Sequence, residues 1–177
     1  GHQANGTNIG IDFREAAPSA ASKDMYLDKN GNAQLTLSQS GHLASGIPGT
    51  IAGLFATMTY AKLPFSQLIQ PAIDLAEKGF VITEKQASSF NSSREAFLKN
   101  NSQPIAFVKE AKWKVGDTLI QKALAATLKR IQTSGAKGFY EGETAQLIVD
   151  EMQRGKGIIS LEDLKKYQPK FRKPIEF

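Results

Sequence analysis

The sequence predicts a mostly helical α+β unit with short strands near both ends. The chain has 177 residues, of which 41% are hydrophobic and 22% charged, an ordinary globular composition at a length typical of one domain. Apolar residues recur at helical spacing through the middle of the chain, whereas a short alternating segment occurs near its start and a closing strand is expected near its end. No repeat or low-complexity linker divides the sequence. Residues 1–177 are therefore expected to form a single unit without a second domain.

The first third of the chain combines one strand, one turn and one helix. Residues 9–13 read Ile-Gly-Ile-Asp-Phe and alternate well enough to predict a strand. Residues 25–37 contain Asn-Gly, which favours a tight turn and predicts a short hairpin or loop. Residues 41–53 are rich in glycine and other small residues, which allow close backbone approach before a helix over about 49–60. Because no Gly-Lys-Ser/Thr sequence follows, this stretch is interpreted as a closely packed turn and not as a phosphate-binding loop.

A helix is predicted over residues 66–77, where the apolar residues share one face. Ser66 or Gln70 is the expected N-cap, and Gly79 follows the last turn as a stop signal. Pro71 is expected in the first turn, because proline lacks a backbone N–H and is tolerated only where that group has no helical partner.

A second predicted helix begins after Thr83, which forms a capping-box pattern with Gln86 and leads to about Lys99. Residues 105–108 are apolar and predict a short strand. The next helix is expected to start at Gly-Asp 116–117 and to end before Gly135. Its apolar stripe consists of Leu119, Ala123, Leu124, Leu128 and Ile131.

The C-terminal part predicts two helices and a strand. Residues 143–154 place apolar side chains on one helical face before Gly155. Ser160 is the expected cap of a short helix that ends near Tyr167. Residues 170–176 are predicted to form a closing strand, which completes the pattern of helices between two terminal strands.

Composition excludes several classes of site. The chain has no cysteine and two histidines, so His2 and His42 leave little material for a metal site, and none is expected. The net charge is +5, and the densest basic cluster, formed by Lys109, Lys112 and Lys114, is interpreted as a solvated face, so nucleic acid is not an expected partner. No apolar run approaches about 18 residues, and no signal-peptide pattern opens the chain. Neither a membrane span nor a signal peptide is therefore expected.

Residues 11–18 read Ile-Asp-Phe-Arg-Glu-Ala-Ala-Pro, which resembles a signature of the γ-glutamyltransferase (γ-glutamyltranspeptidase) family. Further segments resemble that family in the same order. They are the small-residue turn at 42–53, Leu-Pro-Phe at 63–65, Gln-Pro-Ala-Ile at 70–73, Ala-Glu-Lys-Gly-Phe at 76–80, Gly-Asp-Thr-Leu at 116–119, Gly-Phe-Tyr-x-Gly at 138–142, Asp-Leu-x-x-Tyr at 163–167 and Arg-x-Pro-Ile at 172–175. The resemblance covers about residues 9–175, nearly the whole chain.

The resemblance implies a fragment of the large subunit of an N-terminal-nucleophile hydrolase, a class with an αββα fold. Members of the family cut themselves into two subunits and use the threonine freed at the start of the small subunit as nucleophile. This chain resembles only an internal portion of the large subunit. It is therefore expected to carry no catalytic residue and to be inactive alone, while the parent protein cleaves γ-glutamyl amides such as glutathione and transfers the γ-glutamyl group to water, amino acids or peptides.

One site residue follows from the resemblance. The arginine of the family signature binds the α-carboxylate of the γ-glutamyl group, and Arg14 occupies that position here. A guanidinium suits this task, because it offers two parallel hydrogen bonds to a carboxylate and stays charged. Glu15 is expected on the opposite face if the segment is extended, from where it either orients Arg14 or pairs elsewhere. His42 lies among small packing residues and is interpreted as structural.

Other functions remain open at this stage. Within the superfamily they are a cephalosporin-acylase-like amidase and a poly-γ-glutamate-processing transpeptidase, although Arg14 favours a substrate that bears an α-carboxylate. From a different class, the chain could be a non-catalytic helical module for subunit association. The family implies a glutathione-like γ-glutamyl substrate, the small subunit of the same precursor as partner, no cofactor, and a periplasmic or secreted location.

Overall fold

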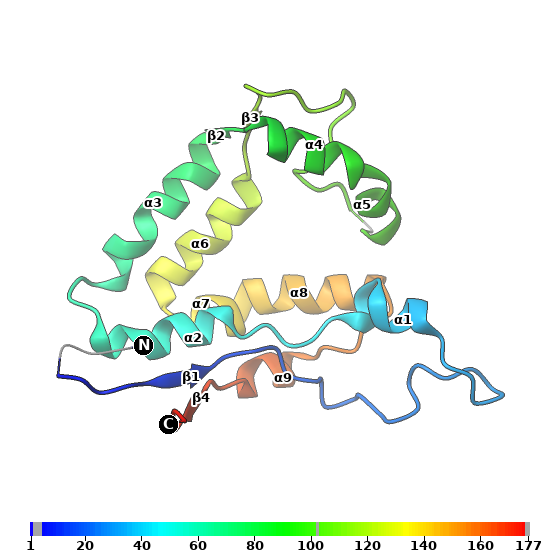
Figure 1. Cartoon of the computed structure of the whole chain (residues 1–177), viewed down its shortest axis with the longest axis horizontal. Coiled ribbons are helices and arrows are strands. Elements are labelled where there is room, and N and C mark those ends of the chain that lie inside the picture. Colours follow the sequence, from blue (N-terminus) through cyan, green and yellow to red (C-terminus); the bar gives the residue numbers. More distant parts are fainter. Residues whose placement is uncertain (2–4, 102, 176–177) are drawn as a thin grey trace.

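The computed structural model describes residue 1 and residues 5–101 and 103–175. Figure 1 shows a layer of helices beside a two-stranded ribbon. The layer consists of α2 (Thr50–Thr57), α7 (Lys137–Tyr140), α8 (Gly142–Arg154) and α9 (Leu161–Lys166). The helix pair α3 (Phe65–Lys78) and α6 (Lys122–Ser134) extends from this layer, and at its far end lie the strands β2 (Phe80–Val81) and β3 (Thr118–Leu119) and the helices α4 (Glu84–Ser92) and α5 (Arg94–Asn100). Within the described ranges, no helix is both long and apolar enough to cross a membrane.

The ribbon consists of β1 (Gly10–Asp12) and β4 (Lys170–Arg172), which pair antiparallel with Ile11 opposite Phe171. Both terminal strands were predicted, but the second is shorter than the predicted 170–176: residues 173–175 are not part of it, and residue 176 lies outside the described residues. The two strands pair with each other, so segments at opposite ends of the sequence are held side by side (Figure 1).

Residues 25–39 form a turn and a short helix. Leu27 and Ala33 form an isolated bridge around the Asn-Gly turn, which confirms the predicted hairpin or loop. Helix α1 (Leu35–Gln39) and the 3₁₀ helix η1 (His42–Ala44) follow, and neither was predicted.

The predicted helix over about 49–60 is confirmed as α2 (Thr50–Thr57) followed by the 3₁₀ helix η2 (Met58–Tyr60). Its glycines allow close packing against β1. A methyl group at Gly49 would overlap the Phe13 carbonyl oxygen, and one at Gly53 would overlap the Phe13 ring. Gly49 and Gly53 therefore allow Phe13, the residue after β1, to pack directly against α2.

Helix α3 (Phe65–Lys78) confirms the predicted helix, but its start is different. The N-cap is Pro64, not Ser66 or Gln70, and Pro71 lies in the middle of the helix. An internal proline costs about 3 kcal/mol relative to alanine. Buried Ile69 and Ile73 pack against Ile131 of α6, and this tertiary contact keeps the helix continuous through the proline.

The capping box of Thr83 and Gln86 is confirmed at the start of α4 (Glu84–Ser92). The helix does not continue unbroken to Lys99, because Ser93 separates it from α5 (Arg94–Asn100). The ψ angle of Ser93 is −2°, whereas an α-helix has a ψ of about −42°, so the regular helical geometry is interrupted at this residue. Just before this break, the Asn91 side chain makes two hydrogen bonds of 2.8 Å with the Trp113 backbone, which tie the end of α4 to the following loop.

Two predictions between residues 103 and 121 are wrong. Residues 105–108 form a turn and no strand, because Phe107 packs into an aromatic cluster with Phe90 and Trp113. Gly-Asp 116–117 starts no helix. Leu119 belongs instead to β3 (Thr118–Leu119), which pairs antiparallel with β2 (Phe80–Val81), and its side chain is buried in the same cluster.

Helix α6 (Lys122–Ser134) therefore begins later than predicted. Helix α8 (Gly142–Arg154) confirms the helix predicted over 143–154, and α7 (Lys137–Tyr140) precedes it without having been predicted. Helix α9 (Leu161–Lys166) confirms the short helix capped by Ser160, which forms a capping box with Asp163. The core between α2, α7, α8 and α9 consists of Ile47, Ala52, Tyr140, Ala145, Val149, Ile159 and Leu164.

Candidate functional site

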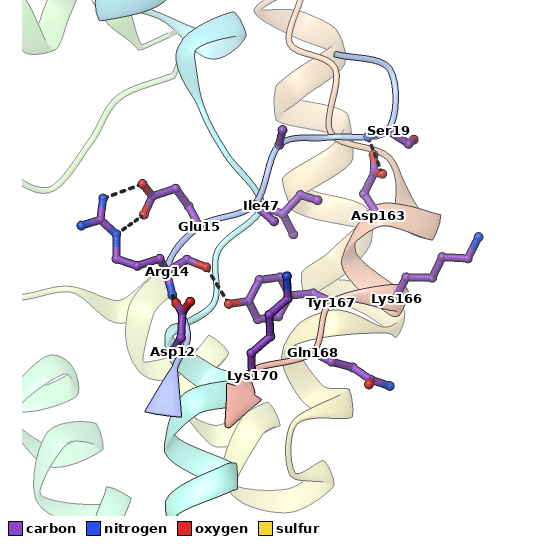
Figure 2. A pocket seen from close by; sticks show the side chains of 12 residues that line it. Asp12, Arg14, Glu15, Ser19, Ile47, Asp163, Lys166, Tyr167, Gln168 and Lys170 are labelled. Atoms are coloured by element: carbon purple, nitrogen blue, oxygen red, sulfur yellow. Dashed lines mark hydrogen bonds and ion pairs between the residues drawn. The ribbon is translucent and has the colours of Figure 1, made fainter. Parts of the chain in front are cut away.

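Arg14 lies two residues beyond β1, where the chain leaves the ribbon. Its side chain is 82% exposed and lines a pocket of about 450 Å³ (Figure 2). It also lines a second pocket of about 440 Å³, formed with residues of β1 and the start of α2. The Arg14 side chain is therefore open to solvent, and the residue borders both pockets.

Glu15 pairs with Arg14 and does not point to the opposite face. Arg14 Nε donates to Glu15 Oε2 at 3.1 Å, and Nη2 donates to Oε1 at 2.7 Å. The expectation of opposite faces required an extended segment, but regular strand geometry ends at Asp12. Glu15 thus holds the fork of the guanidinium in the orientation that Figure 2 shows.

Hydrogen bonds and nearby opposite charges favour the charged forms of Arg14, Glu15 and Asp12. The hydrogen bond and the negative charge of Glu15 raise the pKa of Arg14, and Arg14 lowers the pKa of Glu15 in return. A hydrogen bond from Arg172, followed by one from the Arg14 backbone, lowers the pKa of Asp12. All three groups are therefore charged at neutral pH.

The opposite wall of the larger pocket is built on α9. Asp163 is 6% exposed, and its Oδ1 accepts a hydrogen bond of 2.9 Å from the Ser19 backbone N–H. Its Oδ2 accepts from the backbone N–H and the hydroxyl of Ser160 at 2.9 and 2.8 Å. Burial raises the pKa of Asp163, but the hydrogen bonds from Ser19 and Ser160 outweigh burial and lower it. This carboxylate ties the segment after Arg14 to α9.

Tyr167 lines this pocket, although no site role was predicted for it from the sequence. Tyr167, the residue after α9, donates a hydrogen bond from its hydroxyl to the Arg14 carbonyl oxygen at 2.6 Å (Figure 2). It was noticed only as part of the Asp-Leu-x-x-Tyr segment. No local signal joins the two residues, because 153 positions separate them in sequence.

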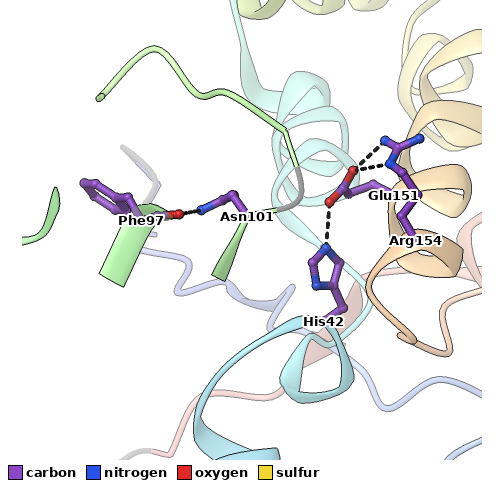
Figure 3. Close-up of polar contacts among 5 residues, drawn as sticks. All are labelled: His42, Phe97, Asn101, Glu151 and Arg154. Atoms are coloured by element: carbon purple, nitrogen blue, oxygen red, sulfur yellow. Dashed lines mark hydrogen bonds and ion pairs between the residues drawn. The ribbon is translucent and has the colours of Figure 1, made fainter. Parts of the chain in front are cut away.

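His42 lies elsewhere, against α8. Its Nε2 is 2.7 Å from Glu151 Oε1, and Arg154 donates to the other oxygen of the same carboxylate (Figure 3). His42 and Glu151 line a different pocket, of about 500 Å³, that extends to the end of α5. The structure therefore does not bring His42 and Arg14 together, and the interpretation of His42 as structural stays a prediction.

The basic cluster is only partly a solvated face. Lys109 Nζ is 2.6 Å from Asp117 Oδ2 and 4.5 Å from the centre of the Trp113 ring. Lys109 is thus packed against the aromatic cluster, whereas Lys112 and Lys114 are exposed. Among the residues that the structure describes, no group of three or more histidine, aspartate or glutamate side chains is placed to hold a metal ion.

Known proteins match this chain in sequence and in fold. A glutathione hydrolase proenzyme from Pseudomonas sp. (strain A14) is 42% identical over 176 residues, which cover 98% of this chain and 31% of that protein. The crystal structure of Helicobacter pylori gamma-glutamyltranspeptidase is 48% identical with a TM-score of 0.94, and the match covers 98% of this chain and 51% of that one. A cephalosporin acylase from Bacillus halodurans, 22% identical, has a TM-score of 0.77 over 94% of this chain and 32% of its own, which shows a shared fold alone.

The structural matches establish the fold class of this chain. It is an α+β segment of the N-terminal-nucleophile hydrolase fold, which confirms the prediction from the sequence. The family model described as Gamma-glutamyltranspeptidase matches residues 1–177. The chain belongs to the gamma-glutamyltranspeptidase family. It spans about 31% of the length of the curated relative from Pseudomonas.

Proposed function

We propose that this chain is the carboxylate-binding part of an enzyme that cleaves γ-glutamyl amides, and that Arg14 binds the α-carboxylate of the γ-glutamyl donor. One observation carries the proposal. Arg14 belongs to the family signature at residues 11–18, its side chain lines a pocket, and Glu15 binds one edge of its guanidinium. Glu15 takes the edge formed by Nε and Nη2, so a substrate carboxylate can accept two parallel hydrogen bonds from the other edge of the exposed guanidinium, formed by Nη1 and Nη2.

The reaction we propose is acyl transfer by covalent catalysis. A threonine hydroxyl, on a part of the polypeptide that this sequence does not include, attacks the γ-carbonyl and expels the amine. The resulting γ-glutamyl ester is then released by water, an amino acid or a peptide. Arg14 contributes by binding a group remote from the scissile bond, which orients the γ-carbonyl for attack.

The same proposal extends to partners and location. We propose a glutathione-like donor, self-cleavage of a precursor, and association of this chain with the small subunit of that precursor in the periplasm or outside the cell. Residues 1–177 would act as one folding unit of the large subunit, with neither a cofactor nor a catalytic residue of their own.

A cephalosporin-acylase-like activity, a poly-γ-glutamate-processing activity and a purely associative role are the alternatives. The exposed Arg14 favours a donor with an α-carboxylate over the first alternative. Turnover of a small γ-glutamyl amide by the complete protein separates the main proposal from the associative role, and the purified 177-residue chain is the negative control.

The substitution Arg14→Lys in the complete protein tests the assignment. A charged hydrogen bond contributes about 1.5–3 kcal/mol, and lysine keeps the charge but loses the fork. The value of kcat/KM for γ-glutamyl-p-nitroanilide should therefore fall about 10- to 100-fold, with a larger loss for Arg14→Ala. Arg94→Lys, at the start of α5, is the matched control and should leave kcat/KM unchanged.

The specificity of the loss decides the role of Arg14. A 4-aminobutanoyl anilide lacks only the α-carboxylate of the γ-glutamyl donor. A loss confined to the γ-glutamyl donor supports carboxylate binding. An equal loss on both donors, with unchanged thermal stability, would show that Arg14 serves another purpose.

A further inference from the structure

The backbone of Arg14 is held at both ends, although its side chain is exposed. On the amino side, the Arg14 N–H donates to Asp12 Oδ1 at 3.2 Å. On the carboxyl side, the Arg14 carbonyl oxygen accepts the Tyr167 hydroxyl at 2.6 Å (Figure 2). A long, flexible side chain reaches a defined point only if its Cα is fixed, so these two contacts limit where the guanidinium can go.

Tyr167 is itself anchored in the core of the helical layer. Its ring stacks on Tyr140 at 5.9 Å between centroids and an interplanar angle of 9°. The buried Tyr140 hydroxyl donates to the Pro48 carbonyl oxygen at 2.7 Å and accepts from the Ala52 N–H at 3.2 Å. The position of the Tyr167 hydroxyl is thus set by contacts that do not involve Arg14.

The space around this hydroxyl is closely filled. A methyl group at Gly49 would overlap both the Tyr167 hydroxyl oxygen and the Phe13 carbonyl oxygen. The glycine therefore permits the tyrosine to reach the peptide that follows β1. Burial raises the pKa of Tyr167, as do the charges of Asp12 and Glu15, so the hydroxyl remains a hydrogen-bond donor at neutral pH.

We propose that Tyr167 is a positioning residue for substrate binding: its hydroxyl holds the Arg14 carbonyl and thereby sets the point from which the guanidinium reaches the α-carboxylate. This inference rests on the proposed function of Arg14. Tyr167 follows α9 and is 153 positions from Arg14 in the sequence. The inference gives this distant residue a role in the affinity for the γ-glutamyl donor. Tyr167 touches no reacting atom in this role.

A double-mutant cycle in the complete protein tests the inference. Tyr167→Phe removes one hydroxyl and keeps the ring that stacks on Tyr140. One neutral hydrogen bond corresponds to a loss of about three- to tenfold in kcat/KM for γ-glutamyl-p-nitroanilide, and we expect it mainly as a higher KM. In the Arg14→Ala background the same change should cost less than about twofold, because Tyr167 then has no guanidinium to position.

The control is Tyr26→Phe, which removes a different hydroxyl that bonds to the Leu43 carbonyl at 3.1 Å, and which should leave KM unchanged. L-glutamate should protect the protein against thermal unfolding, and this protection measures carboxylate binding without turnover. The protection should be weaker in the Tyr167→Phe variant.

If the wild type is active and the Tyr167→Phe variant binds and turns over the donor normally, this inference is overturned and the proposed function is not. Equal losses in the wild-type and Arg14→Ala backgrounds also overturn it, because they indicate a general structural effect. A complete wild-type protein that cleaves no γ-glutamyl amide overturns the proposed function, and this inference with it.

Discussion

At the scale of single residues, Asp163 joins the helical layer to the segment that carries Arg14. Its buried carboxylate accepts three hydrogen bonds, from the Ser19 backbone and from the backbone and hydroxyl of Ser160. Asp163→Ala leaves these donors without their acceptor. The free energy of unfolding at pH 7 should fall by about 1–3 kcal/mol, as measured by urea unfolding of the complete protein. Asp24→Asn, at an exposed position, is the control.

The effect should depend on pH in a defined direction. The pKa of Asp163 is lower in the folded chain than its ordinary value. Its charged form therefore contributes stability that is fully present above the unfolded pKa of about 3.9 and is lost as pH falls through the folded pKa. The difference in stability between wild type and Asp163→Asn should shrink under those acidic conditions. A difference that is constant from pH 7 to below the folded pKa would contradict a role for the charge.

At the scale of elements, the packing of α2 on the end of β1 depends on two glycines. Glycine within a helix is ordinarily less stable than alanine by about 0.5–1 kcal/mol, so replacing Gly53 on a free helix would stabilise it. Here the added methyl overlaps the Phe13 ring, and at Gly49 it overlaps the Phe13 backbone. Both Gly53→Ala and Gly49→Ala should therefore destabilise the protein, by about 1–3 kcal/mol, with the larger loss at Gly49.

Thermal melting of the complete protein measures this effect. The matched control is Thr57→Ala, an exposed position in the last turn of the same helix, which should change stability by less than about 0.5 kcal/mol. Stabilisation by either glycine substitution would show that β1 and α2 are not packed as closely as described.

At the scale of the whole molecule, large apolar side chains remain uncovered on several elements. Those on α3 and on the strands at its far end are Leu68, Leu75 and Val81, and those on other elements include Leu124, Leu147, Phe171 and Ile175. β1 and β4 pair only with each other among the described residues, so each of these two strands has an outer edge with no strand beside it. Exposed apolar patches and open edges favour association.

The purified 177-residue chain should therefore self-associate or bind a hydrophobic dye. Light scattering at increasing concentration and dye fluorescence measure the two outcomes, with the complete protein as the comparison. A chain that stays monomeric at high concentration and binds no dye would show that these surfaces need no partner.

The sequence by itself determined the features that depend on neighbouring residues. The capping box at Thr83 and the cap residue Ser160 marked two helix starts, because each contact spans three positions. The first terminal strand and the helix over 143–154 followed from periodicity. Arg14 was found through the signature that surrounds it, and its role as a ligand for carboxylate stays a prediction.

Only the tertiary structure decided features that depend on residues far apart in sequence. Leu119 lies in a strand because Phe80 of β2 pairs with it. Pro71 lies within α3 because the buried face of that helix packs against α6. The contact of Tyr167 with Arg14 spans 153 positions, and no local pattern encodes such a distance. The physical reason is the same in each case: burial and pairing with a distant segment outweigh local preferences of about 1–3 kcal/mol.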